Sequence, residues 1–161
     1  MAAEAGRPLT SGERDALSPG LADALDAAGA KPRIVPKAST LAQISSVWRG
    51  HTPILTLGDN IHWPTPPDDC CTPGREPHMA VLQHELQHVL EFAKGELAAW
   101  NYALNPRNWS YDFELKPDSR WRDFGAEQRA AIVEEYWRLG RGLNQKPGDI
   151  ERYRSIIPWS K

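Results

Sequence analysis

The segment His84-Glu85-Leu86-Gln87-His88 constrains the fold of this chain more than any other feature. On a helix, residues four apart lie on one face, about 6 Å apart along the axis. Two imidazoles placed in this way can bind one Zn²⁺ at about 2.0–2.1 Å each. Glu85 projects about 100° round the same helix, within reach of a water bound by the metal. The segment therefore predicts a helix that carries two metal ligands, His84 and His88, and one general base.

The residues around this segment predict an amphipathic helix. Neither proline nor glycine occurs between Ala80 and Ala93 to break it. At about 100° per residue, the apolar side chains fall on one broad arc, and His84 and His88 fall on the opposite side. The arc consists of Met79, Leu82, Leu86, Val89, Leu90, Ala93 and Leu97. We therefore expect one side of the helix to pack into the core and the other side, with both histidines, to face a cleft.

The third metal ligand should come from another helix. A metzincin would have glycine and histidine where this chain has Glu91 and Lys94, so the sequence excludes that class. Glu91 lies on the histidine face, but about 10.5 Å of helical rise separates it from His84, too far to share one metal. The segment 124–139 is the best source, because it is periodic and has no glycine or proline after Gly125.

Three glutamates of this segment are candidates, in the order Glu127, Glu134 and Glu135. Glu127 comes first because it lies in the first turn, three residues before the small Ala130, and a small residue there allows the histidine helix to approach closely. The alternative for each is a carboxylate exposed to solvent, the usual position of a glutamate on a helix. We therefore expect Glu127 to complete the site.

Five blocks, in order along the chain, carry a resemblance to a known family. They are residues Arg7–Glu13, Thr56–Pro64, Leu82–Val89, Tyr111–Leu115 and Asp123–Val133. Together they resemble the small HExxH zincin-like metallopeptidases of the type associated with type VI secretion spike and Rhs components. The resemblance implies a zincin-like domain, a gluzincin-type site with Glu127 as third ligand, and a place among secretion-system components. The pair Cys70-Cys71 departs from the family's pattern.

The expected chemistry is zinc-dependent hydrolysis of a peptide bond in a peptide or protein substrate. Two histidines and a glutamate leave a fourth position of the zinc ion open for water. Glu85 would take a proton from that water and pass it to the leaving amine. An oxyanion donor is also needed, and the candidates are Tyr111, Tyr102, Tyr136 and His62. Tyr111 leads, because it lies in a family-like block between the two ligand helices.

Turn and capping residues predict an α+β fold, mostly helical, in one compact domain over residues 1–161. Besides the metal helix and the segment 124–139, short helices are expected at Ser11–Leu17 with Thr10 as cap, at Leu21–Ala28, and from Pro147 or Asp149 to Ile157. Residues 1–8 are expected to form a flexible arm. Loops are expected at 64–77 and 105–120, and Gly95 permits a bend before Glu96–Leu104.

A small β-hairpin is expected beside the metal helix, with strands Pro53–Leu57 and Ile61–Trp63. It is the only strong strand pair before that helix, so it is the expected edge to which an extended peptide adds. His62 and Trp63 could then line the cleft, and the alternative for Trp63 is packing beneath the hairpin. Lys31–Pro36 is predicted to be a short extended segment, and Ser39–Trp48 is ambiguous between helix and strand.

Composition excludes several other classes of protein. The net charge is −2 and the pI about 6.2, so the basic excess of a nucleic-acid-binding protein is absent. No apolar run approaches the roughly 18 residues of a membrane span, and the first residues lack a hydrophobic signal core. We therefore expect a cytoplasmic protein with no nucleic-acid or membrane partner, unless a non-classical secretion system exports it.

Two adjacent cysteines, Cys70 and Cys71, do not make a disulfide framework. We expect two reduced thiols in a loop. The alternative is a second metal site that these thiols form with Asp68, Asp69 and His78.

Two other classes of function remain open. A zinc-stabilised adaptor of a secretion system would keep the three ligands without turnover and would tolerate loss of Glu85. A secreted peptidase effector would act in a target cell, and its expression would arrest growth.

Overall fold

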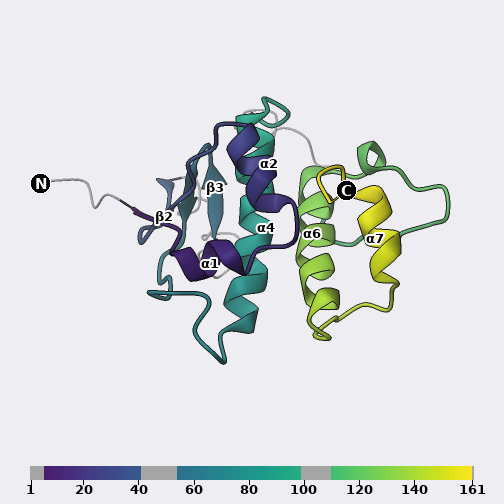
Figure 1. The fold of residues 1–161 in the computed structure, drawn as a ribbon. Coiled ribbons are helices and arrows are strands. Elements are labelled where there is room, and N and C mark those ends of the chain that lie inside the picture. The colour runs from purple at the N-terminus through teal and green to yellow at the C-terminus, as the bar shows by residue number, and fades with distance from the viewer. Residues whose placement is uncertain (1–5, 41–53, 99–109, 161) are drawn as a thin grey trace, which may run out of the picture.

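Helix α4 (Glu76–Ala93) runs through the centre of the molecule, and the other elements surround it (Figure 1). The computed structural model describes residues 6–40, 54–98 and 110–160. Pro77 lies in the first turn of α4, where the missing N–H of proline breaks no helical hydrogen bond. After the last helical residue the chain turns at Gly95, whose φ of +71° suits glycine. The predicted unbroken helix through the HExxH segment is confirmed.

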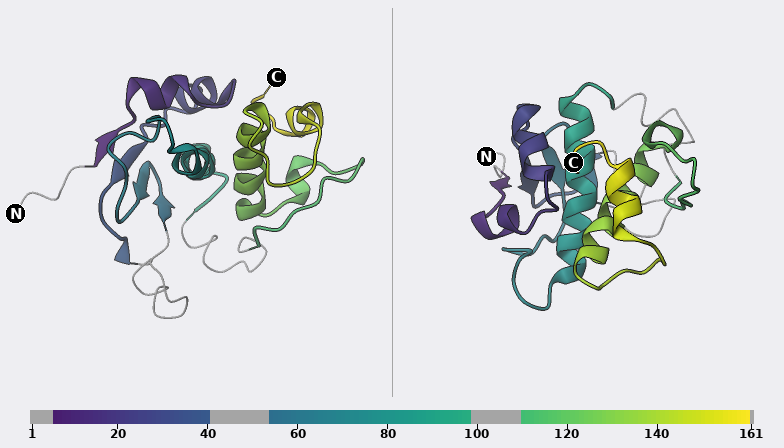
Figure 2. Two further views of the ribbon diagram at one scale, coloured as in Figure 1. Left: turned by 90° about the horizontal axis from the view of Figure 1, so that it is seen from below. Right: turned by 45° about the vertical axis from the view of Figure 1, so that its right-hand side comes forward.

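A sheet and several helices cover different sides of α4. The four-stranded sheet lies on one side, and helices α6 (Ala126–Gly140) and α7 (Ile150–Ile156) lie on the opposite side. Helices α1 (Ser11–Asp15) and α2 (Leu21–Ala27) lie along a third side, as the view down α4 shows (Figure 2). These elements form a small compact α+β domain, so the predicted fold class is confirmed at this level.

The sheet has the strand order β1-β2-β4-β3. Its strands are β1 (Arg7–Pro8), β2 (Arg33–Val35), β3 (Leu55–Leu57) and β4 (Asn60–His62). Strands β3 and β4 are antiparallel and form the predicted hairpin, which turns at Gly58, where φ is +61°. Strand β4 also pairs in parallel with β2, so the extended piece expected at 31–36 is an inner strand. Among the described strands, β3 lies at one edge.

The N-terminal segment is more ordered than expected. Arg7 and Pro8 pair with β2, so the prediction of a flexible arm over residues 1–8 is wrong for 6–8. The Arg7 guanidinium donates to both carboxylate oxygens of Glu13, at 2.7 and 2.8 Å, and Glu13 is fully buried. Glu13 also completes a capping box with Thr10, the predicted cap. A two-residue strand is too short to show the alternation that predicts a strand from sequence.

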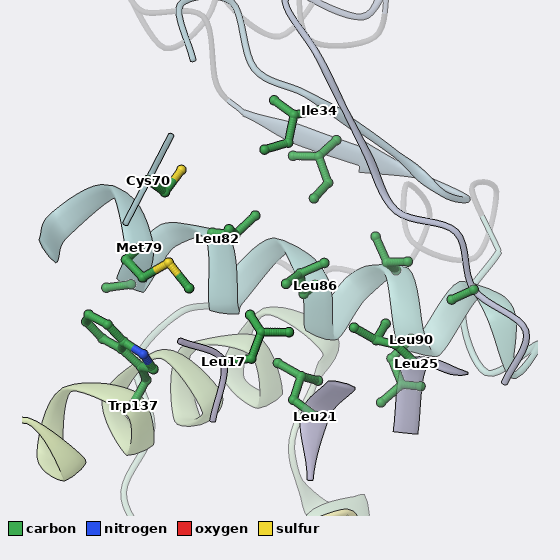
Figure 3. Packing of buried hydrophobic residues seen from close by; sticks show 14 of the residues in the cluster. Leu17, Leu21, Leu25, Ile34, Cys70, Met79, Leu82, Leu86, Leu90 and Trp137 are labelled. Carbon is green, nitrogen blue, oxygen red and sulfur yellow. The ribbon is translucent and has the colours of Figure 1, made fainter. Parts of the chain in front are cut away.

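The main hydrophobic core lies along α4, between the sheet and helices α1 and α2 (Figure 3). Buried members of the predicted arc are Met79, Leu82, Leu86, Val89, Leu90 and Leu97. Ala93 was predicted on the same arc, but it is exposed, because it is the last residue of α4. Trp63 is buried in this core, which confirms that it packs beneath the hairpin.

The histidine side of α4 is covered as well. Every residue from 82 to 91 is buried, because α6 packs over the face opposite the sheet. Helix α6 therefore covers most of the histidine face, and the expected cleft is a small pocket lined in part by Glu85, His88 and Glu127. A second hydrophobic cluster behind α6 consists of Phe124, Ile132, Val133, Tyr136, Tyr153, Ile156 and Ile157.

The segments after α6 and before it also bear on the predicted helices and loops. Helix α7 begins after Asp149, whose carboxylate accepts from the N–H of Glu151, so Asp149 rather than Pro147 starts the last helix. Residues 110–120 contain no helix or strand, as expected, and a 3₁₀ turn, η2 (Trp121–Asp123), follows them. Tyr102 and most of Ser39–Trp48 and Glu96–Leu104 lie outside the described residues. None of the helices in the described ranges is long and apolar enough to cross a membrane.

Candidate metal centre

His84, His88 and Glu127 meet between α4 and α6. Their ligand atoms all lie within 4.8 Å of one another. The Nε2 atom of His84 lies 2.9 Å from one Glu127 oxygen, and Nε2 of His88 lies 3.3 Å from the other. The three side chains are buried, at 7%, 4% and 3% exposed. Two imidazole nitrogens and one carboxylate oxygen at these separations form a group that could bind a metal ion.

The sequence of α6 explains why Glu127 reaches the histidines. Gly125 precedes the helix as its N-terminal cap, so Glu127 lies in the first turn. Ala126 and Ala130 are fully buried against neighbouring elements. Because neither has a bulky side chain, the start of α6 approaches α4 closely. The structure thus brings together the three residues that spacing and helix pattern predicted as ligands.

Glu134, the second candidate for third ligand, lies on the other side of the His84 ring. One of its carboxylate oxygens lies 3.3 Å from Nδ1 of His84, and the other accepts from Arg138 at 2.9 Å. A proton on Nδ1 is therefore directed at Glu134, which leaves Nε2 to face Glu127. A carboxylate in this position fixes the orientation of a metal-binding imidazole and raises its basicity. Glu134 supports a ligand and does not replace one.

Glu135, the third candidate, has a different partner. It is buried, and one of its oxygens accepts from the backbone N–H groups of Gln145 and Lys146, both at 2.7 Å. This carboxylate holds the segment that follows α6. It lies outside the His84, His88 and Glu127 group.

Charges within the group are strongly coupled. Burial alone would lower the pKa of His84, but hydrogen bonds with Glu127 and Glu134 outweigh burial and raise that pKa to about 10. Burial would raise the pKa of Glu127, but hydrogen bonds with His84 and His88 hold it well below its usual range. Both shifts favour a positively charged His84 beside an ionised Glu127. Metal binding must release a proton, because an imidazole ligand is neutral.

Glu85, the predicted general base, lies beside the ligand group and not within it. Its side chain is 6% exposed, and one carboxylate oxygen accepts from the Thr56 hydroxyl at 2.8 Å. Glu85, His88 and Glu127 line one small pocket. A carboxylate that lines the same pocket as two of the candidate ligands can act on a molecule bound there without being a ligand itself.

The same pocket, which we call the metal-site pocket, has an apolar and an aromatic wall. Its lining residues are Ile54, Leu55, Thr56, Glu85, His88, Phe92, Leu97, Tyr111 and Glu127. Edge strand β3 supplies one wall. Tyr111 supplies another, and its ring stacks on His84 with centroids 5.9 Å apart and planes at 27°. The pocket therefore places a strand edge next to the base and the ligands.

The candidates for an oxyanion donor differ in whether they line the metal-site pocket. Tyr111 lines the metal-site pocket and is 49% exposed. Tyr136 is buried in the second hydrophobic cluster. His62 lies on the inner strand β4, and Trp63 stacks on His78 with centroids 6.0 Å apart. The strand that lines the pocket is β3, and neither His62 nor Trp63, which could have lined a cleft, is among the lining residues.

The paired cysteines take part in a structural network. The N–H of Cys70 donates to Glu13 at 2.8 Å, and the Cys71 thiol donates to the carbonyl of Gly12 at 2.8 Å. Both cysteines are free thiols, as expected. Asp69 accepts from the N–H of Cys71 at 2.9 Å. In the described part of the chain, His84, His88 and Glu127 are the one group arranged for a metal, so the alternative of a second site finds no support.

Sequence reasoning missed Thr56, and it considered Glu134 only as a ligand and not as a partner of His84. Thr56 is a hydroxyl residue at a buried strand position, where alternation predicts an apolar side chain, and this was the available signal. For Glu134 the signal was its spacing of seven residues, about two turns, from Glu127.

Comparison of this chain with protein-family models, with curated proteins and with solved structures finds no match.

Proposed function

We propose that this protein is a zinc-dependent peptidase with a gluzincin-type site. The observation that carries the proposal is the convergence of His84, His88 and Glu127, two of which line one pocket together with Glu85. Two imidazole nitrogens and one carboxylate oxygen are the ligands of catalytic zinc in several peptidases, and they leave a fourth position open. Carboxylates alone would suit Mg²⁺ or Ca²⁺ better, so the two imidazoles favour zinc. A zinc ion held here supplies Lewis acidity that activates water and polarises a carbonyl group.

The residues of the chain carry the remaining steps. Glu85 removes a proton from the attacking water, whose oxygen forms the new bond to the carbonyl carbon. As the carbon–nitrogen bond breaks, Glu85 transfers that proton to the leaving amine, and the base returns to its starting state. The Tyr111 hydroxyl is our candidate donor to the oxyanion, because this ring borders the pocket.

The position of β3 suits an extended peptide substrate. The backbone at the free edge of a sheet can pair with an added strand, and β3 has this position among the described strands. Leu55 and Thr56 of β3 line the metal-site pocket, so a peptide along this edge would pass the base and the ligands. This geometry favours a peptide or protein substrate over a small molecule.

The resemblance to zincin-like metallopeptidases associated with type VI secretion spike and Rhs components supports the same assignment. We extend it to a role in such a secretion system, either as a cytoplasmic component or as an exported peptidase effector. One observation also favours a zinc-stabilised adaptor without turnover: the three ligands are almost fully buried between two helices. Such an ion could serve only to hold α4 and α6 together.

Glu85→Gln separates the peptidase from the adaptor. The substitution keeps the size of the side chain but removes the base, so we expect zinc content to stay and kcat on a peptide library to fall by about 10²–10⁴-fold. Glu76→Gln, on the exposed first turn of the same helix, is the matched control and should leave turnover unchanged. Equal turnover in wild type and Glu85→Gln would refute the assignment of the base. A zinc-loaded wild type with no turnover would favour the adaptor.

A further inference from the structure

The hydroxyl of Thr56 is buried at a strand position where an apolar side chain is usual. It is the middle residue of β3, it is 4% exposed, and it pairs with the fully buried Ile61. Its strand neighbours Leu55 and Leu57 point to the other face and are only half-buried. A strand position that faces the core usually carries an apolar side chain, because a buried hydroxyl without a partner costs free energy.

The partner of this hydroxyl is the carboxylate of Glu85. Thr56 Oγ1 lies 2.8 Å from Oε2 of Glu85 and 3.5 Å from the main-chain oxygen of the same residue. A hydroxyl has one proton to donate, and the shorter distance directs it to the carboxylate. Hydrogen bonds to an ionised acceptor are about twice as strong as neutral ones. The contact therefore ties the edge strand to the side chain of the base and only weakly to the helix backbone.

We propose that Thr56 is a positioning residue that holds Glu85 in place for proton transfer. This inference rests on the proposed role of Glu85 as the base. A glutamate side chain has several rotatable bonds, and one fixed oxygen restricts the carboxylate to a narrow range of positions. The other oxygen is then the one that takes the proton from water. Because β3 also borders the pocket, one strand positions both the base and the bound peptide.

Two substitutions at Thr56 test the hydroxyl itself. Thr56→Val keeps the volume and the branched shape but removes the donor, and Thr56→Ser keeps the donor. We expect Thr56→Val to lower kcat by about 10- to 100-fold, since a small misplacement of a reacting group has effects of this size. KM and zinc content should stay near the wild-type values, and Thr56→Ser should retain most of kcat. Thr65→Val, at an exposed loop position, is the matched control.

A double variant shows whether Thr56 acts through Glu85. If it does, adding Thr56→Val to Glu85→Gln should cause no further loss of the residual turnover, because there is no base left to position. A full additional loss in the double variant would overturn the proposal. Loss of zinc, or equal loss of kcat in Thr56→Val and Thr56→Ser, would also overturn it, since a purely structural role for Thr56 predicts these results.

A structural readout makes the inference independent of turnover. Crystal structures of the zinc-loaded wild type and of Thr56→Val should show the Glu85 carboxylate displaced from its wild-type position in the variant. An unchanged carboxylate would refute the positioning role even in an active enzyme. Conversely, a displaced carboxylate in a protein that cleaves no peptide would refute the peptidase assignment and leave the contact between Thr56 and Glu85 established.

Discussion

At the residue scale, the two ring nitrogens of His84 define the arrangement of the centre. Nε2 faces Glu127 and Nδ1 faces Glu134, so one imidazole lies between two carboxylates of the same helix. Glu134 is in turn paired with Arg138. A ligand histidine held in this way has a defined tautomer and a defined direction. Glu127 is therefore placed to bind a metal, whereas Glu134 is placed to orient His84, one of the other candidate ligands.

Substitution of each glutamate should separate these two roles. Glu134→Gln removes the charge behind His84 and keeps the shape, so we expect zinc affinity to fall about 10- to 100-fold. Glu127→Ala removes a ligand and should weaken zinc binding much further. Competition with a chromophoric chelator measures both affinities, and Glu76→Gln again serves as the control. If Glu134→Gln weakened zinc binding more than Glu127→Ala, the ligand assignment within α6 would be wrong.

At the element scale, Glu13 joins β1, the start of α1 and the distant loop before α4. Its carboxylate accepts from Arg7 of β1, from the N–H of Thr10 at the start of α1, and from the N–H of Cys70 in the loop before α4. Burial would raise the pKa of Glu13, but these hydrogen bonds outweigh it and lower the pKa to about 2. The proline-rich loop before α4 is thus anchored by one buried carboxylate.

This anchor predicts a dependence of stability on pH. The pKa of Glu13 is lower in the folded protein than its ordinary value of 4.5, so its contribution is present above about pH 4.5 and is lost as the pH falls towards 2. At about 1.4 kcal/mol per pKa unit, that contribution is on the order of 3 kcal/mol. Urea unfolding of the wild type and of Glu13→Gln between pH 7 and pH 2.5 measures it. The two proteins should differ most at pH 7 and converge at low pH. A constant difference would contradict this linkage.

Helix α4 also shows what a sequence pattern can and cannot predict. The apolar arc and the HExxH segment predicted the helix, its core side and its two histidines. The polar residues on the other side were expected to face a cleft, yet Gln87 and Glu91 are buried. Gln87 donates to Glu91 one turn further along the helix, but their other partners are remote: Glu91 pairs with Arg129, and Gln87 accepts from the indole N–H of Trp159. A periodic pattern within one helix contains no information about such partners.

On the scale of the whole molecule, the two hydrophobic clusters meet across a polar layer between α4 and α6. This layer contains the candidate metal ligands and the buried pair Glu91–Arg129, whose atoms lie 2.7 and 3.0 Å apart. Apolar contact across the layer is provided by Trp137 of α6, which reaches the first cluster. Buried charges stabilise a fold weakly unless all of them are compensated. The contact between the two halves should therefore depend on what fills the metal site.

Zinc binding should stabilise the contact between α4 and α6 more than any other part of the molecule. Binding to the folded state alone contributes about 2.7 kcal/mol when free zinc is 100 times the Kd, which should raise Tm by several degrees. Hydrogen exchange in α6 should slow on adding zinc, while exchange in the β2–β4 pair should change little, because those strands do not contact the site. A variant with both His84→Ala and His88→Ala is the control, since it should show neither effect. Uniform slowing across the sheet and α6 would mean that the metal stabilises one cooperative unit, and no slowing in α6 would mean that the ion does not join the two helices.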